Sequence, residues 1–265
     1  MKLFLDADSI LFKAACTQDS QYDTRMVTNR IIKDSIADCF ADETYIAIKG
    51  KDNFRYKVYA DYKSSRKDTK MEQGLKDRLN AAYKYLLCEW NAVAADGMEA
   101  DDLVSIWAYE ARDADEDFVI GHIDKDINQI AGNHYNYNKK EIYFIDDNQA
   151  DLNFCVQLLI GDAGDDIPKL KKGYGIKSAQ KALANTTYDN RMSTVVDQWK
   201  RLYGKGWENQ LNLVGNLIYM KRTWDLEEWN YEDRYKRETD VSKSNGRNTS
   251  DKNEERKELH ADISN

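Results

Sequence analysis

Carboxylate side chains gather in four tight clusters along this chain of 265 residues. Each cluster follows an apolar run or opens a helical one, so folding can bring all four to one edge of a sheet. Such negative charge in one pocket requires a cation, and Mg²⁺ and Mn²⁺ prefer carboxylate oxygens and take few of them per ion. The number of acids therefore indicates a two-metal site for phosphoester chemistry. The clusters are Asp6 and Asp8; Glu99, Asp101 and Asp102; Asp124 and Asp126; and Asp162, Asp165 and Asp166.

Each cluster taken alone has a simpler interpretation. Asp and Glu stabilise helix N-termini, where they accept hydrogen bonds from free N–H groups and complement the helix dipole. Residues 98–102 fit a charged first turn of this kind. Four clusters in one chain favour the pocket, because open α/β sheets carry their sites outside the carboxyl ends of the strands.

Residues 49–70 interleave cations with aromatic side chains. Cations neutralise phosphates and aromatic faces stack on unpaired bases, which predicts a channel for a single strand. The alternative is a solvated loop whose aromatic rings pack on the core; long ordered loops in compact domains are more often functional, which favours the channel. The cations are Lys49, Lys51, Arg55, Lys57, Lys63, Arg66, Lys67 and Lys70, and the rings are Phe54, Tyr56, Tyr59 and Tyr62.

The segment from Gly161 to Ala179 is the most specific motif and contains the single proline of the chain. Its glycines permit the tight turn of a helix–hairpin–helix element, in which N–H groups and the start of the next helix bind a phosphate. Lysines add positive charge beside this turn, at Lys169, Lys171, Lys172, Lys177 and Lys181. We therefore expect this segment to bind a nucleic-acid backbone.

Hydrophobic periodicity predicts an α/β domain with a central, mainly parallel sheet, followed by a helical region. The expected domains are residues 1–148, with the loop 49–70 inside them, and residues 149–224. No strand is expected from Gln149 onward. We expect strands at residues 2–5, 44–48, 92–95, 117–123 and 141–145, and helices at 28–40, 75–90, 99–111, 154–160, 178–183, 193–203 and 207–220.

The net charge of −8 is unevenly distributed, and residues 225–265 carry −4 of it. Without the ten clustered carboxylates, residues 1–224 carry +6, so a pocket neutralised by metal ions would leave a surface suited to a phosphate backbone. Residues 225–265 have few aliphatic side chains and cannot offset their chain entropy. We expect a charged, disordered tail there; the alternative is a helix formed on a partner.

The composition is that of an intracellular protein with a sizeable core, at 42% hydrophobic residues. No apolar run approaches the length of about 18 residues that spans a membrane, and the apolar run at the N-terminus is too short for a signal peptide. We expect a soluble, cytoplasmic protein without a membrane partner. Four cysteines without ligand spacing are expected to be reduced core residues: Cys16, Cys39, Cys88 and Cys155.

Over about residues 1–185, these motifs resemble the 5′-nuclease superfamily, in particular the small phage and bacterial 5′-3′ exonucleases and flap endonucleases. The start of the chain is similar to the family's first strand, whose metal-binding Asp falls on Asp6. The other similar segments are 53–55 with 62–66, which resemble the YKxxR signature; 99–102, which match EADD; 124–129, which match DKDxxQ; and 161–179, which resemble GDxxDNIPG…GIGxKTA.

The resemblance implies a PIN-like fold, a flexible arch over the active site and a three-helix H3TH element that holds duplex DNA. It implies two Mg²⁺ ions, with Mn²⁺ as an alternative, and K⁺ is a further candidate at the H3TH element. The implied catalytic residues are Lys63, Arg66 and Asp124. The implied metal ligands are Asp6, Glu99, Asp101, Asp102, Asp124, Asp126, Asp162 and Asp165. The implied DNA contacts are Arg55, Tyr62, Lys169, Lys171, Lys172, Gly173, Gly175 and Lys177.

The implied function is a metal-dependent 5′-3′ exonuclease or structure-specific flap endonuclease of phage or bacterial DNA replication. Its substrates would be DNA with a single-stranded 5′ end, flap, nick or RNA primer, in the cytoplasm of the bacterium or phage host. The tail is a candidate binding segment for a replication protein. One metal ion would lower the pKa of a bound water from about 15.7 toward neutrality for in-line attack, and the second would stabilise the departing 3′ oxygen.

The sequence also departs from the family pattern. Gly50 stands where the second strand of the family ends in a metal-pocket Asp, so we expect the first metal site either to be weaker or to be completed by Asp8 or Asp52. Asp166 replaces the usual Asn, and lysines interrupt the glycine spacing of the hairpin motif. Two alternatives therefore stay open: a DNA-junction binder of this fold without catalysis, and a PIN-type endoribonuclease, which would not need the hairpin motif.

Overall fold

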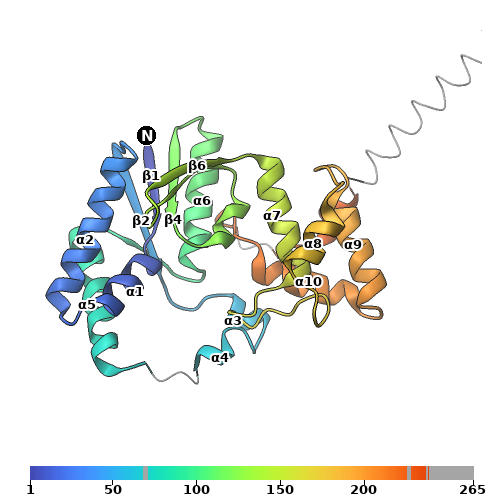
Figure 1. The fold of residues 1–265 in the computed structure, drawn as a ribbon, viewed down its shortest axis with the longest axis horizontal. Helices are drawn as coiled ribbons and strands as arrows, with labels where there is room; N and C mark the ends of the chain where they lie inside the picture. Colours follow the sequence, from blue (N-terminus) through green and yellow to red (C-terminus); the bar gives the residue numbers. More distant parts are fainter. Residues whose placement is uncertain (68–70, 226–227, 237, 239–265) are drawn as a thin grey trace, which may run out of the picture.

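A six-stranded sheet lies at the centre of the computed structural model, which describes residues 1–67, 71–225, 228–236 and 238 (Figure 1). The strand order is β3-β2-β1-β4-β5-β6. Only β6 runs antiparallel to its neighbour, so the expected mainly parallel sheet is confirmed. The strands are β1 (Lys2–Asp6), β2 (Glu43–Lys49), β3 (Val93–Ala95), β4 (Phe118–His122), β5 (Gly132–Asn136) and β6 (Glu141–Ile145).

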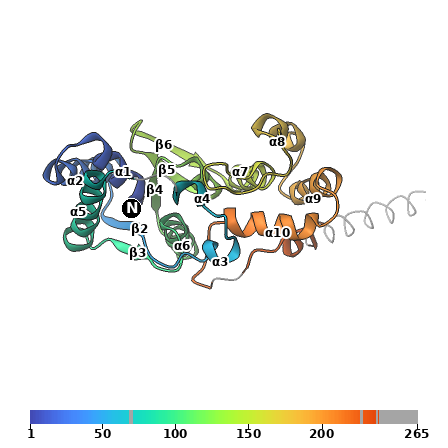
Figure 2. The same ribbon diagram turned by 90° about the horizontal axis from the view of Figure 1, so that it is seen from below.

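Strands β1 and β4 are buried because helices cover both faces of the sheet, as parallel sheets require. Side chains alternate along β1, so that Leu3 and Leu5 pack against α1 (Asp8–Thr17), α2 (Gln21–Asp38) and α5 (Gln73–Glu89). Phe4 points to the other face and packs with α6 (Ala100–Asp113), as Figure 2 shows for the two layers.

The register of the sheet determines which loops meet. Leu5 of β1 pairs with Ile46 of β2 on one side and with Gly121 of β4 on the other. The chain segments that follow these three strands therefore leave the sheet at the same edge. This edge carries Asp6 at the end of β1 and the 3₁₀ helix η1 (Lys125–Gln129) after β4.

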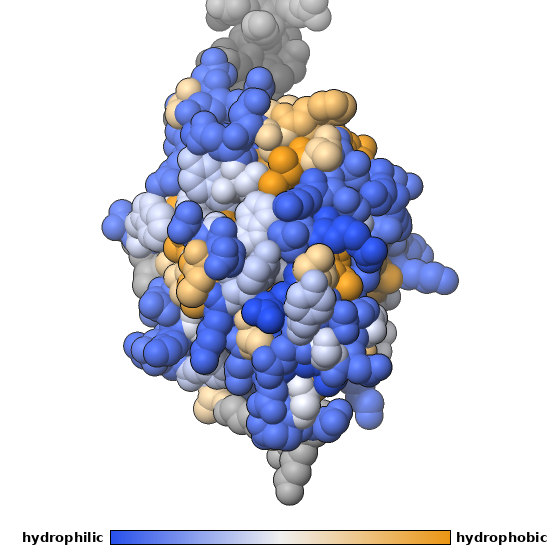
Figure 3. All heavy atoms as spheres, turned by 90° about the vertical axis from the view of Figure 1, so that its left-hand side faces the viewer, coloured by the Kyte–Doolittle hydropathy of each residue, from blue (hydrophilic) through white to orange (hydrophobic). Residues whose placement is uncertain are grey.

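Beyond the sheet, α7 (Asp147–Ile160), α8 (Ile176–Leu183), α9 (Arg191–Leu202) and α10 (Trp207–Ile218) pack around a second core that includes Leu158, Trp199 and Leu217. Two short helices, α3 (Arg55–Val58) and α4 (Ser64–Lys67), connect the sheet to this helical part, and α3 contacts α10. The opposite outer surface, on the side of α2 and α5, is mostly hydrophilic with scattered apolar patches (Figure 3).

The segment 228–236 is ordered, which contradicts the expected disorder from residue 225 onward. Trp229 fills a slot on α10, where a side chain at Gly215 would lie 1.9 Å from the indole ring. The amide of Asn216 bonds both the N–H and the carbonyl of Trp229, at 2.8 and 2.9 Å. Arg234 forms an ion pair with Asp151 of α7. These contacts anchor the segment; residues 239–265 lie outside the described residues.

Several helix starts differ from expectation because caps, and not apolar periodicity, determine them. Helix α2 begins at Gln21, because the side chain of Ser20 accepts from the N–H of Asp23. Helix α7 begins at Asp147, because the side chain of Asp146 accepts from the N–H of Gln149. The expected domain boundary after residue 148 therefore falls in the first turn of α7. The described helices include none long and apolar enough to cross a membrane. Two of the cysteines expected in the core, Cys16 and Cys88, are exposed.

Candidate active site

Four of the predicted carboxylates are brought together by the carboxyl edge of the sheet and the helices that begin there. Asp6 ends β1 and is buried, with its carboxylate accepting from the N–H of Asp8 at 3.2 Å. Asp101 lies in the first turn of α6, and Asp124 caps η1 by accepting from the N–H of Asp126 at 2.8 Å. The cluster of Asp162, Asp165 and Asp166 follows helix α7 and not a strand. The loop after α7 brings it to the same edge of the sheet.

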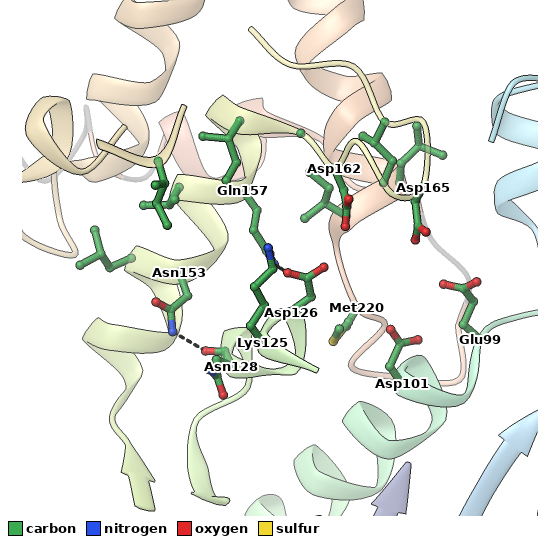
Figure 4. Close-up of a pocket in the computed structure, with 18 of the residues that line it drawn as sticks. Glu99, Asp101, Lys125, Asp126, Asn128, Asn153, Gln157, Asp162, Asp165 and Met220 are labelled. Atoms are coloured by element: carbon green, nitrogen blue, oxygen red, sulfur yellow. Dashed lines mark hydrogen bonds between the residues drawn. The ribbon is translucent and has the colours of Figure 1, made fainter. Parts of the chain in front are cut away.

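A cavity of about 230 Å³ lies between α6, η1, α7 and the loop after α7. Figure 4 shows Asp126 on one side of it, Glu99 and Asp101 facing Asp126, and Asp162 and Asp165 on the loop above. The structure thus collects five of the eight predicted metal ligands in one pocket. Asp6 and Asp124 are not among the residues that line this pocket, but their charges act on Asp101 and Asp126, respectively.

The carboxylates of this site repel one another in the absence of a cation. Burial, followed by the charges of Asp8 and Asp124, raises the pKa of Asp6 to about 7. Burial and the charges of Asp124 and Asp162 raise the pKa of Asp126 to about 7. Asp101 is half-buried beside Glu99, and loss of solvent followed by the charge of Glu99 holds its pKa well above the ordinary range. A bound cation would relieve this cost.

The donor set fits Mg²⁺ or Mn²⁺, because every candidate ligand is a hard carboxylate oxygen. Within the described residues, no three Asp, Glu, His or Cys side chains are grouped closely enough to hold one ion among them. Such an arrangement suits an ion that takes one or two carboxylates and keeps several waters, as Mg²⁺ does. The described carboxylates therefore do not form a closed cage for an ion.

Two predicted cations converge on one carboxylate of the pocket. Lys63 lies 3.4 Å from Asp165, and Arg66 donates to the other oxygen of Asp165 and to the carbonyl of Gly164 at 3.1 Å. Burial opposes the charge of Lys63, but Glu99 and Asp165 raise its pKa above the ordinary value, so it is firmly cationic. Lys63 precedes α4 and has a φ of +52°, so the shared direction of the two side chains does not come from a common helix.

Arg55 and Asp102 form a buried ion pair, which contradicts their predicted roles in DNA and metal binding. Their exposed fractions are 2% and 0%, and one of the two bonds between guanidinium and carboxylate measures 2.9 Å. The carboxylate of Asp102 also accepts from the N–H groups of Glu99 and Lys221, each at 3.0 Å. Asp102 has no free side toward the pocket, and Arg55 has no access to a nucleic-acid backbone.

Tyr62 was expected to stack on unpaired bases, and the structure contradicts this role. Its side chain is 1% exposed, and its hydroxyl donates to Glu99 at 2.9 Å. The ring packs edge-on against Tyr56, with 5.4 Å between the centroids. Tyr62 therefore supports the wall of the pocket.

Gly50, at the position of the missing carboxylate, has no room for any side chain. A Cβ atom there would lie 2.2 Å from the backbone carbon of Ala95. Of the two expected substitutes, Asp8 lies beside Asp6 and accepts from the N–H of Lys49 at 2.9 Å and from Tyr83 at 3.0 Å. Asp52 sits in an exposed turn. Asp8 is thus the carboxylate that the structure places next to the end of β2.

The hairpin motif lies on the surface beside the pocket. Gly175 caps the N-terminus of α8, and Gly173 has a φ of +81°, a conformation that glycine adopts without strain. Ile176 and Gln180 of α8 line the pocket. The predicted lysines point to solvent and not into the pocket: Lys169, Lys171, Lys172 and Lys177 are all exposed.

Gln157 contributes to the site, and sequence reasoning missed it. Its amide donates to Asp126 at 2.6 Å and accepts from Gln129 at 3.2 Å. Gln129, whose position the DKDxxQ motif contains, is held in turn by the backbone of Ile218 and Met220, each at 3.1 Å. The signal in the sequence is a single amide inside the apolar run 154–160, one turn before Gly161.

Residues 2–154 match the family described as "5′-3′ exonuclease, N-terminal resolvase-like domain". No curated protein shows significant sequence similarity to the chain. Among solved structures, the chain is similar to the T5 5′-exonuclease with bound zinc ions, at 14% identity and a TM-score of 0.65, with 90% of this chain and 100% of that chain covered.

Two further solved structures are similar to the chain. One is a variant of the flap endonuclease of bacteriophage T5 in a complex with DNA and metal ions, at a TM-score of 0.59. The other is the T5 D15 protein co-crystallised with metal ions, at a TM-score of 0.57. Each is 14% identical and covers 82% of this chain and 94% of its own. At this identity the likeness establishes a shared fold.

Proposed function

The chain belongs to the 5′-3′ exonuclease family, and we propose that it is a metal-dependent nuclease that hydrolyses DNA at 5′ ends and flaps. The observation that carries this proposal is the pocket in which Glu99, Asp101, Asp126, Asp162 and Asp165 meet the cations Lys63 and Arg66. Carboxylates for metal ions and cations for phosphate oxygens are the two components that phosphodiester hydrolysis requires.

The metal ligands that we propose fall into two groups. Asp6, Glu99, Asp101, Asp124 and Asp126 lie at the sheet edge, and Asp162 and Asp165 belong to the loop after α7. The amide of Gln157 donates to the carboxylate of Asp126 and holds it in place. The chemistry that bound divalent ions supply is activation of the attacking water and stabilisation of the departing 3′ oxygen.

Lys63 and Arg66 would bind the oxygens of the scissile phosphate. Arg66 suits a two-point contact with phosphate, and Lys63 acts as a point charge. Both would stabilise the charge that grows on these oxygens in the transition state. The hairpin motif would hold the adjacent duplex through the backbone N–H groups around Gly173 and Gly175 and through its lysines. We further propose that the protein acts in the DNA replication of a bacterium or phage.

A DNA-junction binder without catalysis is the second candidate, and the crowding at Gly50 favours it. A test that separates the candidates is cleavage of a 5′-labelled flap, a nicked duplex and a structured RNA, each with and without Mg²⁺. Mg²⁺-dependent release of short 5′ products from the DNA supports the nuclease. Binding of the flap without cleavage supports the junction binder, and cleavage of the RNA alone supports an endoribonuclease.

A further inference from the structure

We propose that Asp166 is a positioning residue that holds Lys63 and Arg66 over the carboxylate pocket. The proposal rests on the function proposed above, in which these two cations bind the scissile phosphate. The side chains that line the pocket do not include that of Asp166. Asp166 acts through the backbone of residues 63–66, the segment that carries both cations.

The loop that carries Asp166 is closed at its base. The N–H of Asp162 donates to the carbonyl of Ile167 at 3.2 Å, and the N–H of Ile167 donates back at 2.7 Å. Inside the loop, the N–H of Gly164 donates to the carboxylate of Asp162 at 2.7 Å. These bonds fix the conformation of residues 162–167, so that the loop can serve as a rigid support.

Residues 63–66 dock on this support through backbone and side-chain contacts, which include the hydroxyl of Ser64 on the carboxylate of Asp166 and the following three. The N–H of Lys63 donates to the carbonyl of Asp165 at 3.0 Å, and the guanidinium of Arg66 donates to the carbonyl of Gly164 at 3.1 Å. The N–H of Ser65 donates to the carboxylate of Asp166 at 2.8 Å. In the third contact the side chain of Asp166 holds the backbone of Ser65, so a substitution of Asp166 can remove this contact.

Adjacent acids of this loop therefore have different tasks. Asp165 points into the pocket toward Glu99 and pairs with Lys63 and Arg66 (Figure 4). Asp166 points to the backbone between these two cations. Its own φ of +57° is a conformation that Asp and Asn adopt more readily than most residues.

Lys63 depends on such support because its backbone is unfavourable. Its φ of +52° lies in the left-handed region, which residues other than glycine occupy only where the surrounding structure holds them. The bond from Ser65 to Asp166 fixes the chain two residues after Lys63 and one before Arg66. A group that stabilises a transition state must be placed closely, since a displacement of about 1 Å can cost about 10² in rate.

The positioning role of Asp166 needs an acceptor oxygen but does not need a negative charge. Two variants of Asp166 should therefore behave differently. Asp166→Ala removes the acceptor, and we expect the single-turnover rate of flap cleavage to fall by about 10 to 100-fold, with little change in the dissociation constant for DNA. Asp166→Asn keeps an acceptor oxygen and should retain a rate close to the original. Asp115→Ala is the control, because Asp115 shares the left-handed backbone of Asp166, with a φ of +55°, and is exposed in the turn after α6.

Hydrogen exchange of the amides in residues 59–66 measures the docking without any cleavage. We expect faster exchange in Asp166→Ala than in the original protein, Asp166→Asn or Asp115→Ala. If Asp166→Ala exchanges and cleaves as the original protein does, the positioning role is wrong while the nuclease function stands. If Asp166→Asn is as defective as Asp166→Ala, the hydrogen-bond role is wrong. If the original protein cleaves no substrate, the proposed function fails, and the positioning role, which depends on it, falls with it.

Discussion

Lys63 donates from its ammonium group to Glu99 and thereby joins two walls of the pocket, since it also lies 3.4 Å from Asp165. The second oxygen of Glu99 accepts from Tyr62 at 2.9 Å. Tyr62 and Lys63 thus contact carboxylates on both walls of the pocket, and Lys63 lies where it could also reach a phosphate held between them.

Removing either cation should slow the chemical step more than it weakens binding. We expect Lys63→Ala and Arg66→Ala each to lower the single-turnover rate at saturating enzyme by about 10² or more, comparable to losing one donor to a transition-state oxyanion. Lys57→Ala is the control, because Lys57 is an exposed cation of the same segment. Normal rates in both variants would limit the segment to a docking surface.

Metal affinity should rise with pH. The carboxyls of Asp6 and Asp126 have pKa values of about 7, so each still holds a proton at pH 6 that a metal ion must displace. Titration calorimetry with Mn²⁺ is expected to show tighter binding at pH 8 than at pH 6. Lys63→Ala should bind Mn²⁺ more tightly than the original protein at both pH values, because the competing cation is gone. Equal affinities throughout would contradict the assignment of these carboxylates.

The metal-free protein should lose stability over the same range. A carboxyl such as Asp6, whose pKa is about 7 when folded and near 3.8 when unfolded, binds its proton more tightly in the folded state. The free energy of unfolding therefore falls as the pH rises from 4 to 7, by about 1 to 4 kcal/mol for this group. Urea denaturation in EDTA should show this loss, and Asp6→Asn should remove the share that Asp6 contributes while the shares of Asp101 and Asp126 stay.

The buried pair of Arg55 and Asp102 should contribute to stability. Removing one partner leaves an unpaired buried charge, and we expect Arg55→Ala to lower the free energy of unfolding by about 3 to 5 kcal/mol. Arg112 and Asp147 form a comparable pair with two contacts of 2.7 Å, but it is exposed. Arg112→Ala should therefore cost less than about 1 kcal/mol. A stable Arg55→Ala protein with weakened DNA binding would instead support a DNA contact.

The strands were predictable because their apolar runs are uninterrupted. The exception is β5, where the buried side chains are His134 and Tyr135 and no aliphatic run marks the strand. Helix α1 was missed because Asp8 and the residues after it were assigned to the first-strand motif. Helix starts at caps such as Ser20 were misplaced because apolar spacing does not report them.

The candidate site was predictable in outline, since the carboxyl ends of parallel strands meet at one edge. The direction in which each side chain points could not be predicted. Asp101 and Asp102 are adjacent, and a helix turns by about 100° per residue, so only Asp101 reaches the pocket. Arg55 lies in a hydrophilic segment, but its guanidinium bonds the backbone carbonyls of Leu217 and Tyr219 in the helical part, a contact that no local pattern reveals.

The exposed lysines of the hairpin motif should determine the salt dependence of duplex binding. Each phosphate contact contributes about −0.9 to the slope of log affinity against log salt. The triple variant of Lys171, Lys172 and Lys177 to Ala should therefore bind more weakly and flatten this slope by up to about 2.7. Lys33 and Lys84, exposed on α2 and α5, are suitable control positions. An unchanged slope would place the duplex elsewhere.

Cleavage of a 5′-labelled flap substrate by the original protein and by Asp126→Asn tests the central claim most directly. Asp126 lines the pocket on the side opposite Glu99 and Asp101, and Gln157 holds its carboxylate (Figure 4). We predict cleavage that requires Mg²⁺ and stops in EDTA, and its loss in Asp126→Asn with DNA binding unchanged or tighter, because one repelling charge is gone. Asp115→Asn should cleave normally. Flap cleavage by Asp126→Asn at the original rate, or equal cleavage in EDTA, would contradict a metal-dependent nuclease site in this pocket.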